Sequence, residues 1–336
     1  MQQGMFGAAP AAQAIQQKEA ALGHDQALAF LARALAADRL AHGYLFVGPE
    51  HVGKMTAALA FAATLLCTES PAAHPDFTLV ARERDQKTGK LHGTIVLDQV
   101  HALTGRLALG AFLGGYKVCV IDGAQLFTPE AANALLKTLE EPRKKTVLIL
   151  LVASEAEVLP TIRSRCQVMR FDRVATTAIT AHLEKRGVAA DKALLYARLS
   201  GGLPGKAIAF ADDPASLDAL FALRDMLLRF PELSVAERFA LIEKRIPAKT
   251  PFQEASDRAV VILDLCAELV RDALLVATGM SDMLVHVDAR DRITAWANSA
   301  KSDRLVAAAE EITETRRLLD ANVNPRTVLE RFVLSL

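Results

Sequence analysis

Residues 117–166 constrain the fold of this 336-residue chain more than any other stretch. The stretch opens with an apolar run that is rich in β-branched residues, lacks alternation and ends at Asp122. This pattern is typical of a parallel strand buried on both faces, and α/β sheets hold ligands at the carboxyl ends of such strands. A Thr-Pro-Glu run at 128–130 predicts the start of a helix that Pro142 ends, before a second buried strand at 146–153. The stretch therefore predicts a parallel α/β sheet.

The end of this helix breaks a local rule. Glu140 and Glu141 are expected at its negative pole, where each exposed carboxylate costs about 0.3–1 kcal/mol. Conflicts of this kind tend to mark function. The alternative is a pair of solvated acids beside a proline, and the sequence alone does not decide between the two.

A glycine-rich turn follows the first core strand, which is expected at 42–47. Gly48 and Gly53 flank this turn, and Lys54 opens a helix that is expected to continue through 66. Strand, glycine-rich turn and helix are the context of a P-loop. Glycines let backbone N–H groups curl around phosphate oxygens, and the helix N-terminus adds partial positive charge. In such a site Lys54 would reach the β and γ phosphates.

The residue after Lys54 departs from this motif, which requires serine or threonine as a magnesium ligand. Met55 offers a thioether, which is a poor ligand for a cation that demands oxygen donors. Thr56 lies one position further on, about 100° around the helix, and cannot easily replace that ligand. Two readings stay open, a structural turn without nucleotide and weak, non-productive nucleotide binding.

The chain resembles the AAA+ clamp-loader subunits of bacterial DNA polymerase III. Besides Asp122, the matching motifs are Thr-Pro-Glu-Ala-Ala-Asn-Ala-Leu-Leu-Lys at 128–137, Leu-Glu-Glu-Pro at 139–142, Ile-Arg-Ser-Arg-Cys at 162–166, Gly-Gly-Leu-Pro-Gly-Lys-Ala at 201–207 and Leu-Asp-Ala-Asn-Val-Asn-Pro-Arg at 319–326. The resemblance implies an α/β P-loop AAA+ core with a parallel sheet, a small helical lid and an all-α C-terminal collar. We expect the core at 1–172, with a flexible leader at 1–20, the lid at 173–212 and the collar at 213–336.

A second position departs from the family pattern. P-loop ATPases of this class carry Asp-Glu at the end of the central strand, where the aspartate holds magnesium and the glutamate orients and deprotonates the attacking water. Here Asp122 is followed by Gly123, which has no side chain to act as a base. Loss of a base costs about 10²–10⁴-fold in rate. Together with Met55, this implies a degenerate ATPase site in a subunit that does not hydrolyse ATP by itself.

Ser164 and Arg165 belong to an intact Ser-Arg-Cys motif. In the family that the chain resembles, this arginine is a finger that enters the ATP site of the neighbouring subunit. A planar, permanently charged guanidinium suits a γ-phosphate, and such fingers contribute about 10³–10⁵-fold to the rate. The alternative is an arginine that merely pairs with a nearby acid. Lys206 stands where the family's lid often places an arginine on the nucleotide, with ordinary helix capping as the alternative role.

Four scattered cysteines, Cys67, Cys119, Cys166 and Cys266, form no Cys-x-x-Cys pair. We expect reduced, mostly buried thiols. Several members of the resembled family carry a four-cysteine zinc module, of which this chain keeps one cysteine, followed by His74. One thiol and one histidine cannot complete a tetrahedral site. We therefore expect no zinc, no other metal site and no cofactor beyond weak ATP binding or none.

The resemblance also implies partners. These are the gamma/tau and delta subunits in a hetero-oligomeric ring and, through the complex, the sliding clamp and primer–template DNA. We expect a cytoplasmic protein without a membrane span, because no segment reaches about 18 uninterrupted apolar residues. The chain carries 39 basic and 39 acidic residues, which argues against a free-standing nucleic-acid binder. Alternatives are an ATP-hydrolysing gamma/tau-like subunit or other AAA+ ATPase, and a DNA-binding module outside the polymerase.

Other segments give shorter predictions. His24 is expected to cap or pack rather than to act in a site. Residues 76–80 and 94–97 read as strands, separated by a charged turn at 82–90. From 213 onward the pattern is helical, with a break at 320–326 before a last helix.

Overall fold

The computed structural model describes residues 21–83, 93–300 and 302–335. The leader expected at 1–20 and most of the charged turn expected at 82–90 lie outside these residues. The chain divides into two compact units, with the boundary between Ile208 and Ala209. The division into core, lid and collar stays a prediction.

The first unit contains a five-stranded parallel sheet in the order β2-β3-β4-β1-β5. Its strands are β1 (Gly43–Val47), β2 (Phe77–Val80), β3 (Lys117–Asp122), β4 (Thr146–Val152) and β5 (Gln167–Arg170). Every residue of β1 and β4 is buried, as their uninterrupted apolar sequences predict. The parallel α/β sheet is thus confirmed.

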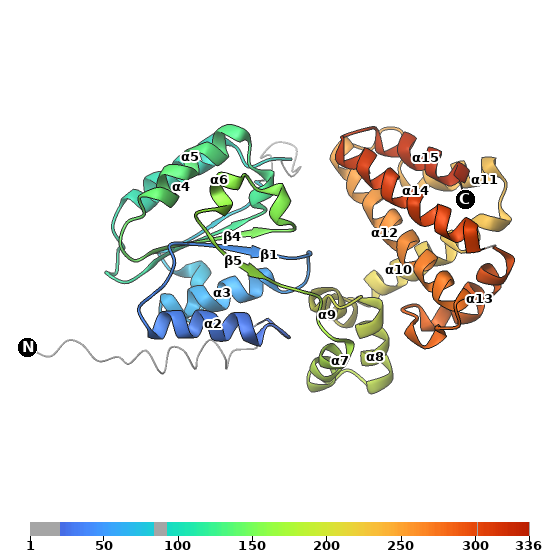
Figure 1. Cartoon of the computed structure of the whole chain (residues 1–336), viewed down its shortest axis with the longest axis horizontal. Helices are drawn as coiled ribbons and strands as arrows, with labels where there is room; N and C mark the ends of the chain where they lie inside the picture. Colours follow the sequence, from blue (N-terminus) through green and yellow to red (C-terminus); the bar gives the residue numbers. More distant parts are fainter. Residues whose placement is uncertain (1–20, 84–92, 301, 336) are drawn as a thin grey trace, which may run out of the picture. The chain divides into compact units, whose positions relative to one another are not determined.

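Helices cover both faces of the sheet (Figure 1). Helices α2 (Asp25–Ala36) and α3 (Lys54–Leu65) lie on one face, and α4 (Leu97–Ala108) and α5 (Pro129–Glu140) lie on the other. Successive side chains of a strand point to opposite faces. Accordingly, Phe46 packs in the cluster with α2 and α3, whereas Leu45 packs in the cluster with α4 and α5.

The start of α5 follows from its sequence. Thr128 is the N-cap, and its hydroxyl oxygen accepts a hydrogen bond from the Ala131 N–H at 3.3 Å, while Pro129 occupies the first helical position. The short α6 (Pro160–Arg163), the helices α7 (Thr176–Lys185) and α8 (Ala190–Leu199), and α9 (Pro204–Asp212) then follow in chain order. Helix α9 crosses the boundary between the two units.

The strand predicted at 94–97 is wrong. Only Ile95 forms a β-bridge there, to Phe127, and Leu97 already opens α4. The Gln99 side-chain oxygen accepts the Val96 N–H at 3.1 Å and so starts the helix at this point. A four-residue apolar run cannot by itself distinguish a strand from the entrance to a helix.

The second unit is helical, as predicted. Its helices are α10 (Pro214–Leu227), α11 (Val235–Arg245), α12 (Phe252–Ala277), α13 (Arg290–Ser299), α14 (Ser302–Asp320) and α15 (Pro325–Ser335). The predicted break lies between α14 and α15, where the Asn324 side-chain oxygen accepts the Arg326 and Thr327 N–H groups at 3.1 and 3.2 Å. Helix α12 packs against α13, α14 and α15 around a core of its own.

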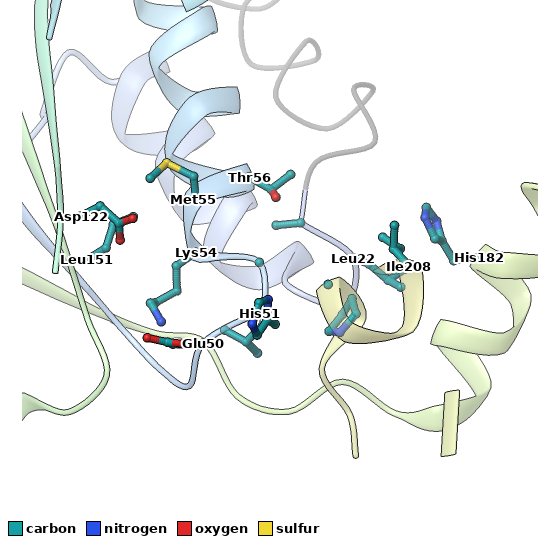
Figure 2. Close-up of a pocket in the computed structure, with 15 residues that line it drawn as sticks. Leu22, Glu50, His51, Lys54, Met55, Thr56, Asp122, Leu151, His182 and Ile208 are labelled. Carbon is teal, nitrogen blue, oxygen red and sulfur yellow. The ribbon is translucent and has the colours of Figure 1, made fainter. Parts of the chain in front are cut away.

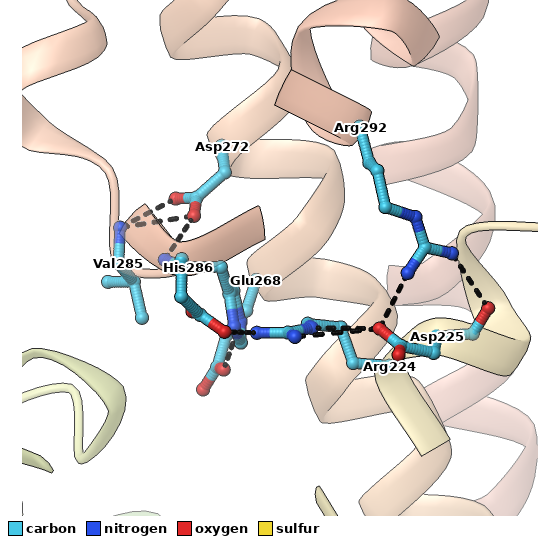
Figure 3. Close-up of polar contacts among 8 residues, drawn as sticks. Arg224, Asp225, Glu268, Asp272, Val285, His286 and Arg292 are labelled. Atoms are coloured by element: carbon cyan, nitrogen blue, oxygen red, sulfur yellow. Dashed lines mark hydrogen bonds and ion pairs between the residues drawn. The ribbon is translucent and has the colours of Figure 1, made fainter. Parts of the chain in front are cut away.

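Buried polar groups hold the loop between α12 and α13 (Figure 3). The carboxylate of Asp272, with 0% of the residue exposed, accepts the Val285 and His286 N–H groups at 3.0 and 2.8 Å. Nearby, Arg224 of α10 donates to Asp288 at 2.6 Å, and Arg292 of α13 donates to Asp225 at 2.7 Å. The Asp272 carboxylate thus satisfies two backbone N–H groups of the loop, and the two ion pairs tie α10 to the η6 turn (Val287–Ala289) and to α13.

Across the residues that the structure describes, we find no helix with both the length and the apolar character that crossing a bilayer requires.

Replacing Asp272 with alanine should destabilise the second unit by about 2–4 kcal/mol, because each buried donor left unpaired costs about 1–3 kcal/mol. Urea unfolding followed by circular dichroism measures this change. The exposed Asp282→Ala variant is the matched control and should change stability by less than about 0.5 kcal/mol. Equal effects of the two substitutions would contradict the role given to Asp272.

Cysteine reactivity should follow burial. Burial raises the pKa of the Cys166 and Cys266 thiols to about 12 and raises the pKa of Cys119 as well, whereas Cys67 is exposed. Since the thiolate is the reactive form, iodoacetamide at pH 8 should label Cys67 first and the other three only after unfolding. Peptide mass spectrometry reads the order, and early labelling of Cys166 would refute it.

Candidate functional site

A cavity of about 460 Å³ lies at the carboxyl ends of the central strands, beside the loop between β1 and α3. Lys54 and Met55 from the start of α3, and Asp122 from the end of β3, line it (Figure 2). Residues from α7 and α9 complete its wall, among them His182 and Gly205. The structure therefore brings Lys54 and Asp122, two of the predicted site residues, to one cavity.

The Lys54 ammonium is satisfied by its own loop. It donates hydrogen bonds to the backbone carbonyls of Gly48 and Pro49, the latter at 2.8 Å. In a phosphate-binding loop, backbone N–H groups point at the ligand. Here two carbonyls of the loop accept two of the three N–H groups of the Lys54 ammonium.

Burial perturbs both charged groups of this cavity. It lowers the pKa of the Lys54 ammonium, and the nearby carboxylates of Glu50 and Asp122 offset part of that shift. It also raises the pKa of the Asp122 carboxyl, which Lys54 partly offsets. Opposite charges therefore stabilise one another across the cavity.

Met55 and Gly123, the two residues that depart from the ATPase pattern, lie near this cavity. Figure 2 shows Met55 on the Asp122 side of the first turn of α3, while Thr56 points to the other side. Gly123 has φ of +82°, and a Cβ there would lie 2.9 Å from the Leu126 side chain. A glutamate at position 123 would thus be strained in this backbone.

Three contacts brace the loop. The Gly205 N–H of α9 donates to the His51 carbonyl at 2.9 Å, and a Cβ on Gly205 would lie 3.0 Å from that oxygen. A Cβ on Gly48 would lie 2.2 Å from the Phe171 carbonyl. The His24 Nε2 donates to the Val52 carbonyl at 3.0 Å. These close approaches fix the loop between the sheet and the helices that follow it.

His24 is 7% exposed, and its ring packs 4.8 Å from the ring of Phe171. The residue precedes α2, but its side chain makes no capping bond to that helix. Packing, one of the two roles expected for it, is the role that the structure shows. Burial lowers the pKa of His24, which favours the neutral ring.

Arg165 does not line this cavity and lies two residues after the end of α6. Its side chain is 35% exposed and forms an ion pair with Glu140 at 2.6 Å. Its Nη1 also donates to the Thr161 carbonyl at 2.9 Å and to the Ser164 hydroxyl at 3.3 Å. Arg165 therefore does pair with a nearby acid, which was the alternative to a finger, yet its guanidinium stays accessible to solvent. Ser164 serves as a local anchor for it.

Two further predictions concern a nucleotide contact at Lys206 and the absence of a metal site. Lys206 does not line the cavity, although its neighbours Pro204 and Gly205 do. Within the described parts of the chain, no group of three histidine, cysteine or acidic residues is arranged to hold a metal ion. Sequence reasoning missed His182 of α7, which carries no motif. It also missed the contact between His51 and Gly205, for which the glycine of the lid motif was the available signal.

Two family models match the chain. The model described as "DNA polymerase III, delta subunit" matches residues 23–175, and the one described as "DNA polymerase III, delta subunit, C terminal" matches residues 240–336. The first lies within the first structural unit, and the second lies within the helical unit. Together they span most of both units.

Relatives agree with these models. The chain is 28% identical to the DNA polymerase III subunit delta' of Bacillus subtilis, covering 89% of this chain and 92% of that protein. It is 39% identical to subunit delta' of Pseudomonas aeruginosa, over 38% of this chain and 42% of that protein. It is 31% identical to subunit gamma/tau of Mycobacterium tuberculosis, over 57% of this chain and only 36% of that protein.

The Bacillus relative is matched over nearly its whole length, and both family models describe subunits of the same polymerase. The fold supplies the P-loop context and the parallel sheet that the motifs predicted. The chain therefore belongs to the delta-prime family of DNA polymerase III clamp-loader subunits.

Proposed function

We propose that this chain acts as the non-hydrolysing subunit of the clamp loader and supplies Arg165 to the ATP site of a neighbouring subunit. It assembles in the cytoplasm with gamma/tau and delta subunits in a hetero-oligomeric ring. Through that complex it helps to load the sliding clamp on primer–template DNA during replication. Its own P-loop contributes structure rather than turnover.

The observation that carries this proposal is the bonding of Lys54 to the carbonyls of Gly48 and Pro49. These bonds take up two of the three N–H donors of the ammonium, so at most one donor is left for a phosphate unless the side chain moves. Met55 supplies no oxygen for magnesium, and Gly123 supplies no base. Each departure weakens a different part of the ATPase machinery, so hydrolysis at this site is not expected.

Exposure of Arg165 supports its role in trans. The guanidinium lies outside the chain's own cavity and reaches solvent, so a neighbour's phosphate can approach it. A guanidinium clamps a transferring phosphoryl group by charge and by directed hydrogen bonds. Ser164 and Thr161 hold one end of the group in place.

An ATP-hydrolysing subunit is the alternative, and the 31% identity to a gamma/tau relative favours it. That similarity covers just over half of this chain, whereas the delta-prime relative is matched over nearly its whole length. The two defects at Met55 and Gly123 also speak against it.

Purified alone, the chain should turn over ATP far below about 1 s⁻¹, the low end of ordinary enzyme turnover. The reason is that magnesium, base and phosphate contacts are all impaired at the same cavity. A coupled phosphate-release assay measures the rate, with the gamma/tau subunit as the positive control. Turnover near 1 s⁻¹ by the isolated chain would support the alternative.

The Arg165→Ala variant should fold and join the loader, while DNA-stimulated ATP turnover of the complex falls by about 10³-fold, the low end for arginine fingers. Arg163→Ala is the matched control, since Arg163 is an exposed arginine two residues away on α6. Gel filtration checks assembly of both variants. Unchanged turnover with Arg165→Ala would refute the proposed role in trans.

A further inference from the structure

Glu140 is placed where the helix itself disfavours it. It is the last residue of α5, at the negative pole of the helix, and its side chain is about half exposed. Its carboxylate nevertheless has a defined partner, because Oε1 lies 2.6 Å from Nη2 of Arg165. The local conflict in the sequence thus coincides with the guanidinium assigned to the neighbour's ATP site.

The ion pair between Glu140 and Arg165 is expected to contribute little to the stability of the fold. Exposed pairs contribute little to stability, since solvent screens them and both side chains lose freedom. The contact instead fixes a long side chain that would otherwise sample many rotamers. Glu140 holds Nη2, and Thr161 and Ser164 together hold Nη1.

The same contacts leave N–H donors of the guanidinium available for a phosphate. A guanidinium carries five N–H donors, and the three acceptors named above engage at most three of them. At least two donors remain for an incoming oxygen. Glu140 and a phosphate can therefore bind the same arginine at once, so the carboxylate need not be displaced.

We propose that Glu140 is a positioning residue that holds the Arg165 guanidinium, before assembly, in the orientation that meets the neighbour's ATP. This inference rests on the proposed function of Arg165. A preorganised group loses less freedom when the partner arrives, and loss of alignment in a reacting complex can cost up to about 10²-fold in rate.

The test uses the reconstituted loader, with kcat and KM for ATP measured in the presence of primed DNA. Glu140→Gln should lower kcat about tenfold and leave KM for ATP and co-elution unchanged, because misalignment weakens stabilisation of the transition state. Glu141→Gln is the matched control, as it removes a neighbouring exposed carboxylate at the same helix end, and it should have no effect. Thermal unfolding of each variant chain should match the wild type.

A double variant separates positioning from a general structural role. If Glu140 acts through Arg165, adding Glu140→Gln to Arg165→Ala should lower kcat no further. An additive loss would overturn the inference. So would a normal or raised kcat for Glu140→Gln alone, which would make Glu140 irrelevant or a competitor of the phosphate.

These outcomes are distinct from failure of the proposed function. If Arg165→Ala lowers kcat but Glu140→Gln does not, only the positioning role is refuted and Arg165 keeps its role. If Arg165→Ala has no effect, the role in trans fails, and the positioning role fails with it.

Discussion

The first unit depends on a strand buried from both sides. Strand β1 pairs with β4 on one edge and with β5 on the other, and helices cover both faces. The loop that follows β1 therefore starts at the carboxyl edge of the sheet, and only β4 separates β1 from β3, which ends at Asp122. The order of the strands in the sheet therefore brings the loop after β1, Lys54 and Asp122 close to one another. The same edge would serve nucleotide chemistry in an intact site.

Close packing holds the loop between β1 and α3 in place. The Phe171 carbonyl, the His24 ring and the Gly205 N–H all contact the loop or its neighbours closely. Lys54 completes the closure by bonding to two loop carbonyls. Arg165 contrasts with this arrangement, since its guanidinium is anchored on one side and still exposed. Lys54 is hydrogen-bonded within its own loop, whereas Arg165 is exposed to solvent. This contrast agrees with the proposal that the subunit assists a neighbour's chemistry.

Sequence patterns predicted the elements whose signals are local. Continuous apolar runs identified β1, β3 and β4, and the Thr128-Pro129 pair located the start of α5. The pattern failed at Ile95, because one bridging residue ahead of a helix resembles a short strand. Lys54 and Asp122, which the motifs singled out, line one cavity, and their role in binding nucleotide stays a prediction.

Contacts between distant residues were beyond local patterns. The lid motif draws attention to Gly205 but does not identify His51 as its partner, because their contact depends on how α9 packs on the loop. Glu140 is an intermediate case. The sequence shows that a carboxylate stands at the unfavourable, negative end of a helix. Only the folded structure shows that Arg165 is its partner. Arg165 pairs with an acid, as the conservative alternative expects, and its side chain is still 35% exposed, while its role as a finger in a neighbour's site stays a prediction.

The central claim is that Arg165, and not Lys54, contributes to ATP hydrolysis by the loader. The most direct test measures ATP turnover of the reconstituted loader in which this chain carries either Lys54→Ala or Arg165→Lys. Lysine keeps the charge at 165 but loses the planar fork that suits a phosphate. We expect turnover to fall strongly with Arg165→Lys and to stay within about twofold of the wild type with Lys54→Ala, provided that both variants assemble. The reverse pattern, with Lys54 essential and Arg165 dispensable, would contradict the role assigned to this subunit.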